Sequence, residues 1–405
     1  MLGADRGRFI DNSFRRWQRF RGGRLTFNTA VFWLTGGDDT PIEQMRGWWR
    51  RDLPSISPVH KLRVHPDGSG VVLYAHQATG IIQDFRFDVP FIKWLGLPPG
   101  EFPSDALRGA EFNPATGDHF LLVREGSLFE DPTYLMGVTP KLDIAWQTLI
   151  VEEHPDPPDP EDPPDPRHPD QLTGPAIDSS GDIFVGWRPT FSDLGEWAMA
   201  KFSPAGSELW RIYYDDVDDF GWNEWDTLTA DESGSIYLVT RQRSGSPGSQ
   251  AIWLTRFDSN GNFTHIHTMG TASNVDQPRV MRWTQGKLIL GSINGGPNLA
   301  RIHNDNGSHD RDVPLPDGHI HLNPGPGTGE GWFDDRGYLY LPTRHGDPDE
   351  AGYGMAIVQT DSSGQVVADF RITDPLHIGE PVCAVHGNDL AMMFGTRVFD
   401  WEPLV

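Results

Sequence analysis

A hairpin signature returns along the chain at intervals of about fifty residues. Each copy has a short apolar run, a polar turn that ends in glycine, and a second apolar run, as in residues 175–187, 228–240 and 331–343. The turn glycines of these copies are Gly70, Gly117, Gly181, Gly234, Gly286, Gly337 and Gly387. A near-constant period indicates a repeat architecture, in which each unit is one supersecondary element that packs against its neighbours.

Most units contain a second turn and therefore four strands. The second turn, of the Asp/Asn/Ser/Pro-x-x-Gly type, occurs in 201–212, 256–266, 301–313 and 358–370. Glycine supplies the positive φ that such turns need. The second strand of a unit, such as IFVGW at 183–187, is apolar at successive positions, which indicates that neighbouring sheets cover both of its faces. Four antiparallel strands in about fifty residues are typical of a β-propeller blade.

The predicted fold is therefore all-β, a single seven-bladed β-propeller of four-stranded antiparallel blades over residues 25–405. The last unit lacks a strand, so residues 25–34 are expected to supply it and close the ring. One interval is longer because it holds the acidic, proline-rich segment 154–171. Proline has no N–H to donate to a sheet, so this segment is expected to be an inserted loop. Residues 1–24 precede the propeller as a basic, aromatic arm.

The units resemble bacterial β-propeller repeats with the pattern D-x-x-G-x-hydrophobic-x-hydrophobic, followed by K-hydrophobic-D-x-x-G. The best match is PAIDSSGDIFVGW … AMAKFSPAGSELWRI at 175–212, and the resemblance covers about 60–402. The Gly-His and Trp-Asp pairs of WD40 repeats and the Gly-Gly signature of kelch repeats are missing. The resemblance implies the fold, but the family has no fixed activity, so function has to be argued from sites.

The charge of −24 is spread unevenly along the chain. Residues 1–51 carry ten arginines against five acidic residues, so the rest of the chain is strongly acidic. An acidic body repels phosphates, and no sequence-specific nucleic-acid binding is expected. The sequence has no apolar run of 18 residues and no apolar signal segment, so no membrane span or secretory signal is expected. The location is left open between cytoplasmic and virion-associated.

Two groups of residues are candidates for metal or catalytic chemistry. The acidic loop at 213–226 could offer oxygen ligands to Ca²⁺, but its spacing does not fit a known calcium loop, so no cofactor is expected. Its candidate ligands are Asp215, Asp216, Asp218 and Asp219. His319 and His321 share one strand face and, with Glu330, could form the site of a propeller lyase or hydrolase. Structural histidines and a solvated loop are the favoured interpretations.

An enzyme is less favoured because of the residues expected at the mouth of the channel. Inner strands are expected to begin near His60, Lys61, Arg108, Thr173, Asp226, Gln277, Arg279, Glu330 and Glu380. These residues are mixed in sign and contain no nucleophile with an adjacent base. The single cysteine, Cys383, excludes a disulfide framework, and its apolar surroundings indicate a buried, unreactive thiol.

The N-terminal region interleaves arginine with aromatic residues, a combination typical of interface hot spots. The candidate docking residues are Arg15, Arg16, Trp17, Arg19, Phe20, Arg21, Trp48, Trp49, Arg50 and Arg51. The favoured hypothesis is a non-enzymatic structural or interaction protein that docks onto other subunits of an assembly. One concrete form is a bacteriophage virion component from the tail or neck. The alternatives are a disordered basic tail, contact with a membrane surface or RNA, and a glycan-binding propeller that uses Trp187, Trp197, Trp222 and Trp225.

Overall fold

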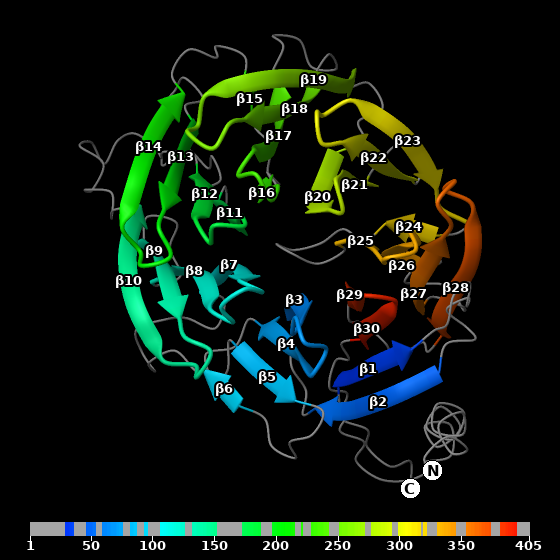
Figure 1. Cartoon of the computed structure of the whole chain (residues 1–405). Coiled ribbons are helices and arrows are strands. Elements are labelled where there is room, and N and C mark those ends of the chain that lie inside the picture. Colours follow the sequence, from blue (N-terminus) through cyan, green and yellow to red (C-terminus); the bar gives the residue numbers. More distant parts are fainter. Residues whose placement is uncertain are drawn as a thin grey trace, which may run out of the picture.

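The protein forms a ring of antiparallel sheets around a central axis (Figure 1). The computed structural model describes residues 29–35, 46–53, 59–75, 82–86, 93–95, 106–125, 132–151, 172–187, 197–214, 220–221, 228–242, 251–271, 277–293, 299–316, 319–321, 330–345, 354–373 and 381–394. These residues contain strands and turns but no helix, so none of them forms a helix that could cross a membrane. The predicted all-β propeller of four-stranded antiparallel blades is confirmed for this part of the chain.

Four sheets use consecutive strands, which follow one another from the axis outward. The first contains β3 (Val59–Val64), β4 (Gly70–Ala75), β5 (Ile82–Arg86) and β6 (Lys93–Leu95). The second contains β7 (Leu107–Phe112), β8 (His119–Arg124), β9 (Thr133–Val138) and β10 (Ile144–Val151). The third contains β11 (Leu172–Ile177), β12 (Ile183–Trp187), β13 (Trp197–Phe202) and β14 (Glu208–Tyr214). The fourth contains β20 (Gln277–Thr284), β21 (Lys287–Ile293), β22 (Leu299–Asn304) and β23 (His309–Pro314).

In two further sheets, two short strands share the inner edge. In one, β15 (Phe220–Gly221) and β16 (Leu228–Ala230) both pair with β17 (Ile236–Gln242), and β18 (Ala251–Phe257) and β19 (Phe263–Thr271) follow outward. In the other, β24 (His319–His321) and β25 (Trp332–Phe333) both pair with β26 (Leu339–His345), and β27 (Gly354–Thr360) and β28 (Val366–Thr373) follow. The backbone of His319 and His321 therefore forms part of the inner edge of this sheet.

The remaining sheet joins segments from both ends of the chain. It contains β29 (Pro381–His386), β30 (Asp389–Phe394), β1 (Thr29–Thr35) and β2 (Arg46–Leu53), in that order. Val31 of β1 pairs with Met393 of β30, and Trp49 of β2 pairs with Trp33 of β1. The segment expected at 25–34 does add a strand to the last unit, since β1 pairs with β30, but the second N-terminal strand, β2, was not predicted. The segment at 46–53 is the outermost strand of the sheet.

The glycines that end the first turn of each unit adopt positive φ, as the turn type requires. The φ values of Gly117, Gly181, Gly234 and Gly337 lie between 80° and 84°. In the first unit, the prediction of Gly70 is wrong, because Gly68 holds this conformation with φ of 64°. Gly70 instead begins β4, where a Cβ atom would lie 2.0 Å from the carbonyl oxygen of Phe85. The segment HPDGSG contains two glycines, and either could end the turn. Only the register of the strands shows which of them does so.

The acidic residue and the cation of the repeat pattern contact each other. The carboxylate of Asp178 accepts hydrogen bonds from two backbone N–H groups of its own turn, including that of Asp182 at 3.0 Å. From the third strand, Lys201 Nζ lies 3.6 Å from Asp178 and 2.8 Å from Asp182. In the next unit, Arg256 lies 4.0 Å from Asp231 in the same arrangement. The repeated D-x-x-G and lysine positions therefore shape the blade.

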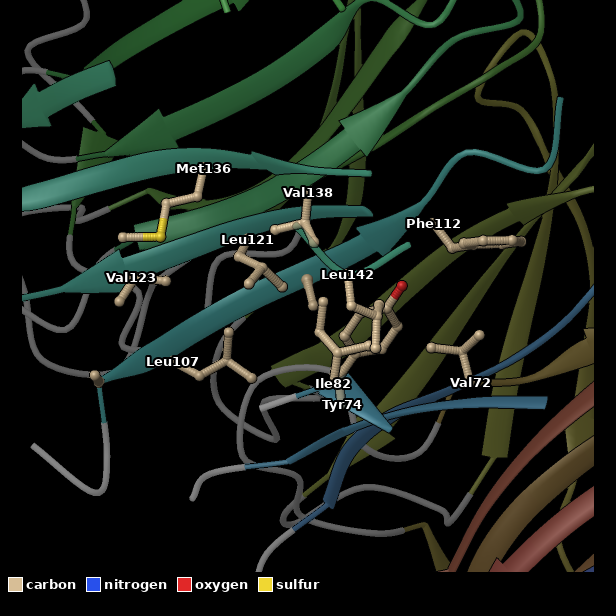
Figure 2. Packing of buried hydrophobic residues seen from close by; sticks show 12 residues of the cluster. Val72, Tyr74, Ile82, Leu107, Phe112, Leu121, Val123, Met136, Val138 and Leu142 are labelled. Atoms are coloured by element: carbon tan, nitrogen blue, oxygen red, sulfur yellow. The ribbon is translucent and has the colours of Figure 1, made fainter. Parts of the chain in front are cut away.

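Blades pack face to face through apolar side chains of their second and third strands. Between the first two sheets, Val72, Tyr74 and Ile82 meet Leu121 and Met136 (Figure 2). All residues of β4, β8 and β12 are buried, which agrees with the prediction that both faces of these strands are covered. Such burial stabilises the ring in proportion to the apolar area removed from water.

A polar pair is buried within the same interface. The hydroxyl group of Tyr74 and Nδ1 of His119 lie 2.8 Å apart, and His119 is 1% exposed. Burial lowers the pKa of His119 to about 4, although the negative charge of Asp84 acts in the opposite direction. His119 is therefore neutral at neutral pH, and it shares a hydrogen bond with the hydroxyl group of Tyr74.

We expect His119→Asn to reduce the sensitivity of the fold to acid. The unfolded histidine takes up a proton near pH 6.5, whereas the folded one does so near pH 4, so acidification between these values favours unfolding. The wild-type protein should lose about 2 kcal/mol more than the variant between about pH 7 and pH 5. Urea unfolding at the two pH values measures this difference. His309→Asn, at an exposed histidine, is the control, and equal losses in wild type and His119→Asn would contradict the prediction.

Candidate functional site

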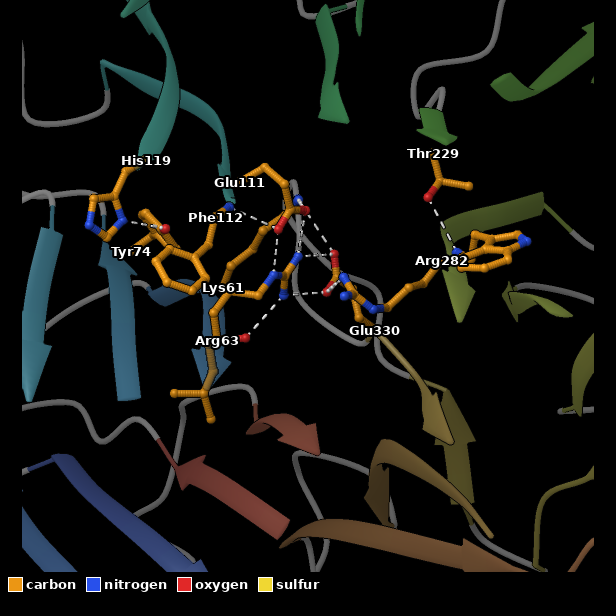
Figure 3. A network of polar contacts seen from close by, with 11 residues as sticks. Lys61, Arg63, Tyr74, Glu111, Phe112, His119, Thr229, Arg282 and Glu330 are labelled. Atoms are coloured by element: carbon orange, nitrogen blue, oxygen red, sulfur yellow. Dashed lines mark hydrogen bonds and ion pairs between the residues drawn. The ribbon is translucent and has the colours of Figure 1, made fainter. Parts of the chain in front are cut away.

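The innermost strands bring several charged side chains together at the axis (Figure 3). Four residues at the axis lie two positions before the first residue of the turn in their units: the charged Arg63, Glu111 and Arg282, and the aromatic Trp332. The turn fixes where each inner strand ends, so equivalent positions reach equivalent points around the ring. Glu330 and Lys61 lie two residues earlier in their own units.

Two carboxylates bind Arg63 along two edges of its guanidinium group. Its Nε and Nη2 donate hydrogen bonds to the two carboxylate oxygens of Glu111, at 2.7 and 2.8 Å. Its Nη1 and Nη2 donate to the two oxygens of Glu330, at 2.6 and 3.1 Å. The Arg63 side chain is 4% exposed. Two bidentate pairs orient a buried guanidinium group strongly.

Glu330 is shared by three cations. Besides Arg63, Arg282 donates from Nη1 to Oε2 of Glu330 at 3.1 Å, and Lys61 Nζ lies 3.4 Å from Oε1. Lys61 Nζ also lies 3.4 Å from Oε2 of Glu111. We call these five residues the axial cluster, and they carry three positive and two negative charges.

The indole ring of Trp332 covers one side of the axial cluster. The Cζ atom of Arg282 lies 3.5 Å from the ring centroid, and that of Arg63 lies 5.4 Å from it. Cations are attracted to the face of an indole ring, and the ring also keeps water away from them. The aromatic surface therefore strengthens the ion pairs that lie against it.

The ion pairs fix the charge states of the cluster. Burial favours the neutral form of Glu330, but the charges of Arg63, Lys61 and Arg282 outweigh it and hold its pKa at about 2. Burial acts in the same way on Glu111, and the charge of Arg63 again holds the pKa well below its usual range. Burial, and then repulsion from Arg63, lowers the pKa of Arg282 to about 10. Both carboxyl groups are ionised near neutral pH and are poorly matched to proton transfer there.

Cys383 lies beside the axial cluster and is buried, as predicted. Its Sγ atom lies 3.8 Å from the backbone oxygen of Glu330, and burial raises the pKa of its thiol far above the usual range. A nucleophilic cysteine needs the opposite shift, toward the thiolate. The described residues of the axis therefore present ion pairs and not an activated nucleophile.

Only some of the residues predicted at the mouth of the channel belong to the axial cluster. Lys61 and Glu330 belong to the axial cluster, whereas Arg108 and Thr173 lie on β7 and β11 outside it. His60, Gln277 and Arg279 lie in β3 and β20, but their side chains are outside the described part, as are Asp226 and Glu380.

The catalytic hypothesis combined two histidines with Glu330. His319 and His321 lie in β24, whose backbone pairs with Thr343–His345 of β26, but their side chains are outside the described part. Their catalytic role stays a prediction. Glu330 itself is engaged by all three cations of the axial cluster, an arrangement that does not suit a general acid or base near neutral pH.

Other candidates lie largely outside the described part of the chain. These are Arg15, Arg16, Trp17, Arg19, Phe20, Arg21, Asp215, Asp216, Asp218 and Asp219. Trp48, Trp49, Arg50 and Arg51 are placed in β2 by their backbone. Within the described segments, no three His, Cys, Asp or Glu side chains are grouped as a metal site.

The glycan hypothesis depended on tryptophans in loops. Trp187 ends β12 with 4% exposure, and the guanidinium group of Arg211 lies 5.0 Å from its ring. Its ring is therefore packed within the fold and offers no open face to a sugar. Trp222, Trp225 and the side chain of Trp197 lie outside the described part.

Three members of the axial cluster were not among the sequence candidates. Arg63, Glu111 and Arg282 follow the predicted starts of their inner strands by two or more residues. When the units are aligned on the first residue of their turns, instead of on the start of the inner strand, these three residues occupy the same position of the repeat. This shared position was the sequence signal that could have identified them.

Comparison with known proteins leaves the function undecided. No protein-family model matches the chain, and no curated protein sequence matches it. A functionally unknown protein from Desulfotomaculum acetoxidans is similar in structure (12% identity, 84% of this chain and 95% of that chain, TM-score 0.48). So is hydrazine synthase from Kuenenia stuttgartiensis (11% identity, 85% and 97%, TM-score 0.49). The acylaminoacyl peptidase of Pyrococcus horikoshii shows 11% identity over 80% of this chain and 46% of that chain, with TM-score 0.49.

At such identities a likeness concerns the fold and carries no activity to this chain. The virion component stays a prediction, since these similarities add nothing in its favour.

Proposed function

We propose that the chain is a non-enzymatic interaction protein, a rigid propeller that docks onto other protein subunits through its N-terminal region. The observation that carries this proposal is the axial cluster, where a propeller enzyme would place its reacting groups. Both carboxylates there are held in ion pairs with Arg63, and the nearby thiol of Cys383 is buried. Such a cluster stabilises and orients the inner strands, which suits a scaffold.

The proposal includes seven blades and a ring closed by the N-terminal region. The pairing of β1 with β30 and of β2 with β1 supports it, because both connect residues near the start of the chain to residues near its end. In a ring closed in this way, β1 pairs with the edge of β30 that would otherwise be exposed. It also ties the docking region to the propeller, because the segment at 46–53 is itself a strand.

The docking surface is expected on β2 and the arm that precedes it. As the outermost strand of its sheet, β2 carries Arg46, Trp48, Trp49, Arg50 and Arg51 at the periphery of the ring. Arginine and tryptophan bury large areas and pair well with acidic partners. A partner with an acidic surface complements this region, whereas the acidic body of the propeller would repel it.

Two truncations test this proposal. The protein with a C-terminal affinity tag is purified from the cells that naturally produce it, as full chain and without residues 1–24. The full chain should elute with a stoichiometric protein partner, and the truncated chain should elute alone, because the arginine-rich arm is lost while β1 and β2 remain. Light scattering after size exclusion measures the masses, and mass spectrometry identifies the partner.

Removal of residues 1–53 is the comparison that separates docking from folding. It deletes β1 and β2, so β30 keeps β29 but loses its partner on the other edge, and the ring should open into an unstable protein. The docking proposal fails if the full chain and the chain without residues 1–24 are both monomeric and bind no partner. The closed-ring proposal fails if removal of 1–53 leaves the unfolding transition unchanged.

A further inference from the structure

The axial cluster has one more positive charge than negative charge among its described residues. Among the residues that the structure describes, Lys61, Arg63 and Arg282 are paired with the carboxylates of Glu111 and Glu330. An excess cation in a buried site is unfavourable unless an anion compensates it. The cluster is therefore short of one negative charge.

Arg282 is the cation of the cluster that lacks a full set of negatively charged partners among the described residues. Arg63 is compensated along both edges of its guanidinium group, while Arg282 has one described acceptor, Glu330, which it reaches through Nη1. The Nε atom of Arg282 is buried and meets no hydrogen-bond acceptor among the described residues. A buried N–H group without an acceptor is unfavourable, and more so when the group is charged.

Arg63 shows what fits such an edge. There, Nε and Nη2 together hold the two oxygens of Glu111. The same edge of Arg282 points away from the bond to Glu330, because Nη1 makes that bond. The Cζ atom of Arg282 lies 3.5 Å from the centroid of the Trp332 ring, so the ring restricts the positions that the edge can take. The Arg282 side chain remains 17% exposed, which gives a ligand access.

We propose that Arg282 binds the carboxylate of a small monocarboxylic acid through its Nε and Nη2 edge, at the centre of the ring. One carboxylate reproduces the geometry of Glu111 on Arg63. One negative charge also balances the three cations and two carboxylates of the cluster. A phosphate dianion would overcompensate it and would repel Glu330. The site does not depend on the N-terminal arm.

The test is binding of acetate and benzoate to the full chain at constant ionic strength. Thermal unfolding and calorimetry should show saturable binding of the two carboxylates, while sodium chloride and inorganic phosphate should not saturate. In Arg282→Gln, which removes the charge and the paired edge, the affinity should fall by about tenfold or more. Arg282→Lys, which keeps the charge but lacks the paired edge, should fold and bind weakly as well.

Arg211→Gln is the matched control, because Arg211 also pairs with one glutamate and lies over a tryptophan, but on the outer strand β14. It should bind both acids as the wild type does. The proposal is overturned if the wild type shows no saturable binding, if phosphate binds more tightly than the carboxylates, or if Arg282→Lys retains wild-type affinity. Since deletion of residues 1–24 leaves the axial cluster intact, failure of the docking proposal and failure of this one are separate results.

Discussion

Replacement of Arg63 by methionine is expected to destabilise the protein by about 3–5 kcal/mol. Methionine keeps much of the length of the side chain but leaves Glu111 and Glu330 without the guanidinium group that binds all four of their oxygens. Lys61 and Arg282 remain, at 3.4 and 3.1 Å from Glu330, and cannot replace those bidentate pairs. Urea unfolding at about pH 7 measures the loss.

The pH dependence distinguishes loss of charge pairing from loss of packing. In the wild type, the ion pairs hold the pKa of Glu330 at about 2. Because this folded-state pKa is below the unfolded value, the stability gained is present above about pH 4.5 and is lost as the pH falls toward about 2. Without Arg63, burial raises the pKa of both carboxyl groups, so the destabilisation should be largest at neutral pH and should shrink at about pH 4.

Arg211→Met is the matched control for this experiment. Arg211 pairs with Glu208 at 2.7 Å, but the two side chains are 25% and 37% exposed. Exposed ion pairs contribute about 0–1 kcal/mol, and salt screens them. A loss of stability by Arg63→Met that equals the loss by Arg211→Met, or that does not change with pH, would show that the axial cluster contributes little.

The blades could be predicted because their residues act locally. A turn such as Asp178–Gly181 closes its own hairpin, and its glycine is marked by the positive φ that it must adopt. The apolar run of β12 was predicted as a strand with both faces covered, and each of its residues is buried. Neither inference needs any knowledge of which blades are neighbours.

The axial cluster was harder to predict because it depends on the ring. Arg63 and Glu330 are 267 residues apart, and they meet because β3 and the segment that leads into β25 converge on one axis. Lys61 and Glu330 were predicted at the channel because inner strands were expected to begin near them. The sequence did not show which later residues of each strand lie closest to the axis. Arg63 and Glu111 pair because both lie at the point where their inner strands reach the axis. Only the assembled ring determines where that point lies along each strand.

The strand at 46–53 was not predicted because composition dominated the interpretation of the N-terminal region. The arginines and tryptophans of 46–53 indicated a docking segment, and the structure places their backbone in a strand. This strand depends on β1, which in turn depends on β30 at the opposite end of the chain. A strand whose partner is formed by distant residues has a weak local signal.

Gly109→Ala is expected to cost about 3 kcal/mol, although it adds one methyl group. Gly109 lies on the inner strand β7, and a Cβ atom there would be 2.0 Å from the carbonyl oxygen of Gly174 on the neighbouring inner strand β11. The obstacle is backbone, which cannot rotate away as a side chain can. The two inner strands would have to separate, and thermal or urea unfolding measures the cost.

Gly286→Ala provides the comparison, since a Cβ atom there meets nothing within 4 Å and the φ of 73° alone is unfavourable. Its cost should be about 1 kcal/mol. A displaced β7 also carries Glu111 away from Arg63, so Gly109→Ala and Arg63→Met should be non-additive by more than about 0.5 kcal/mol. If the two effects simply add, the spacing of the inner strands and the axial ion pairs are independent, and the cluster is not held in place by blade contact.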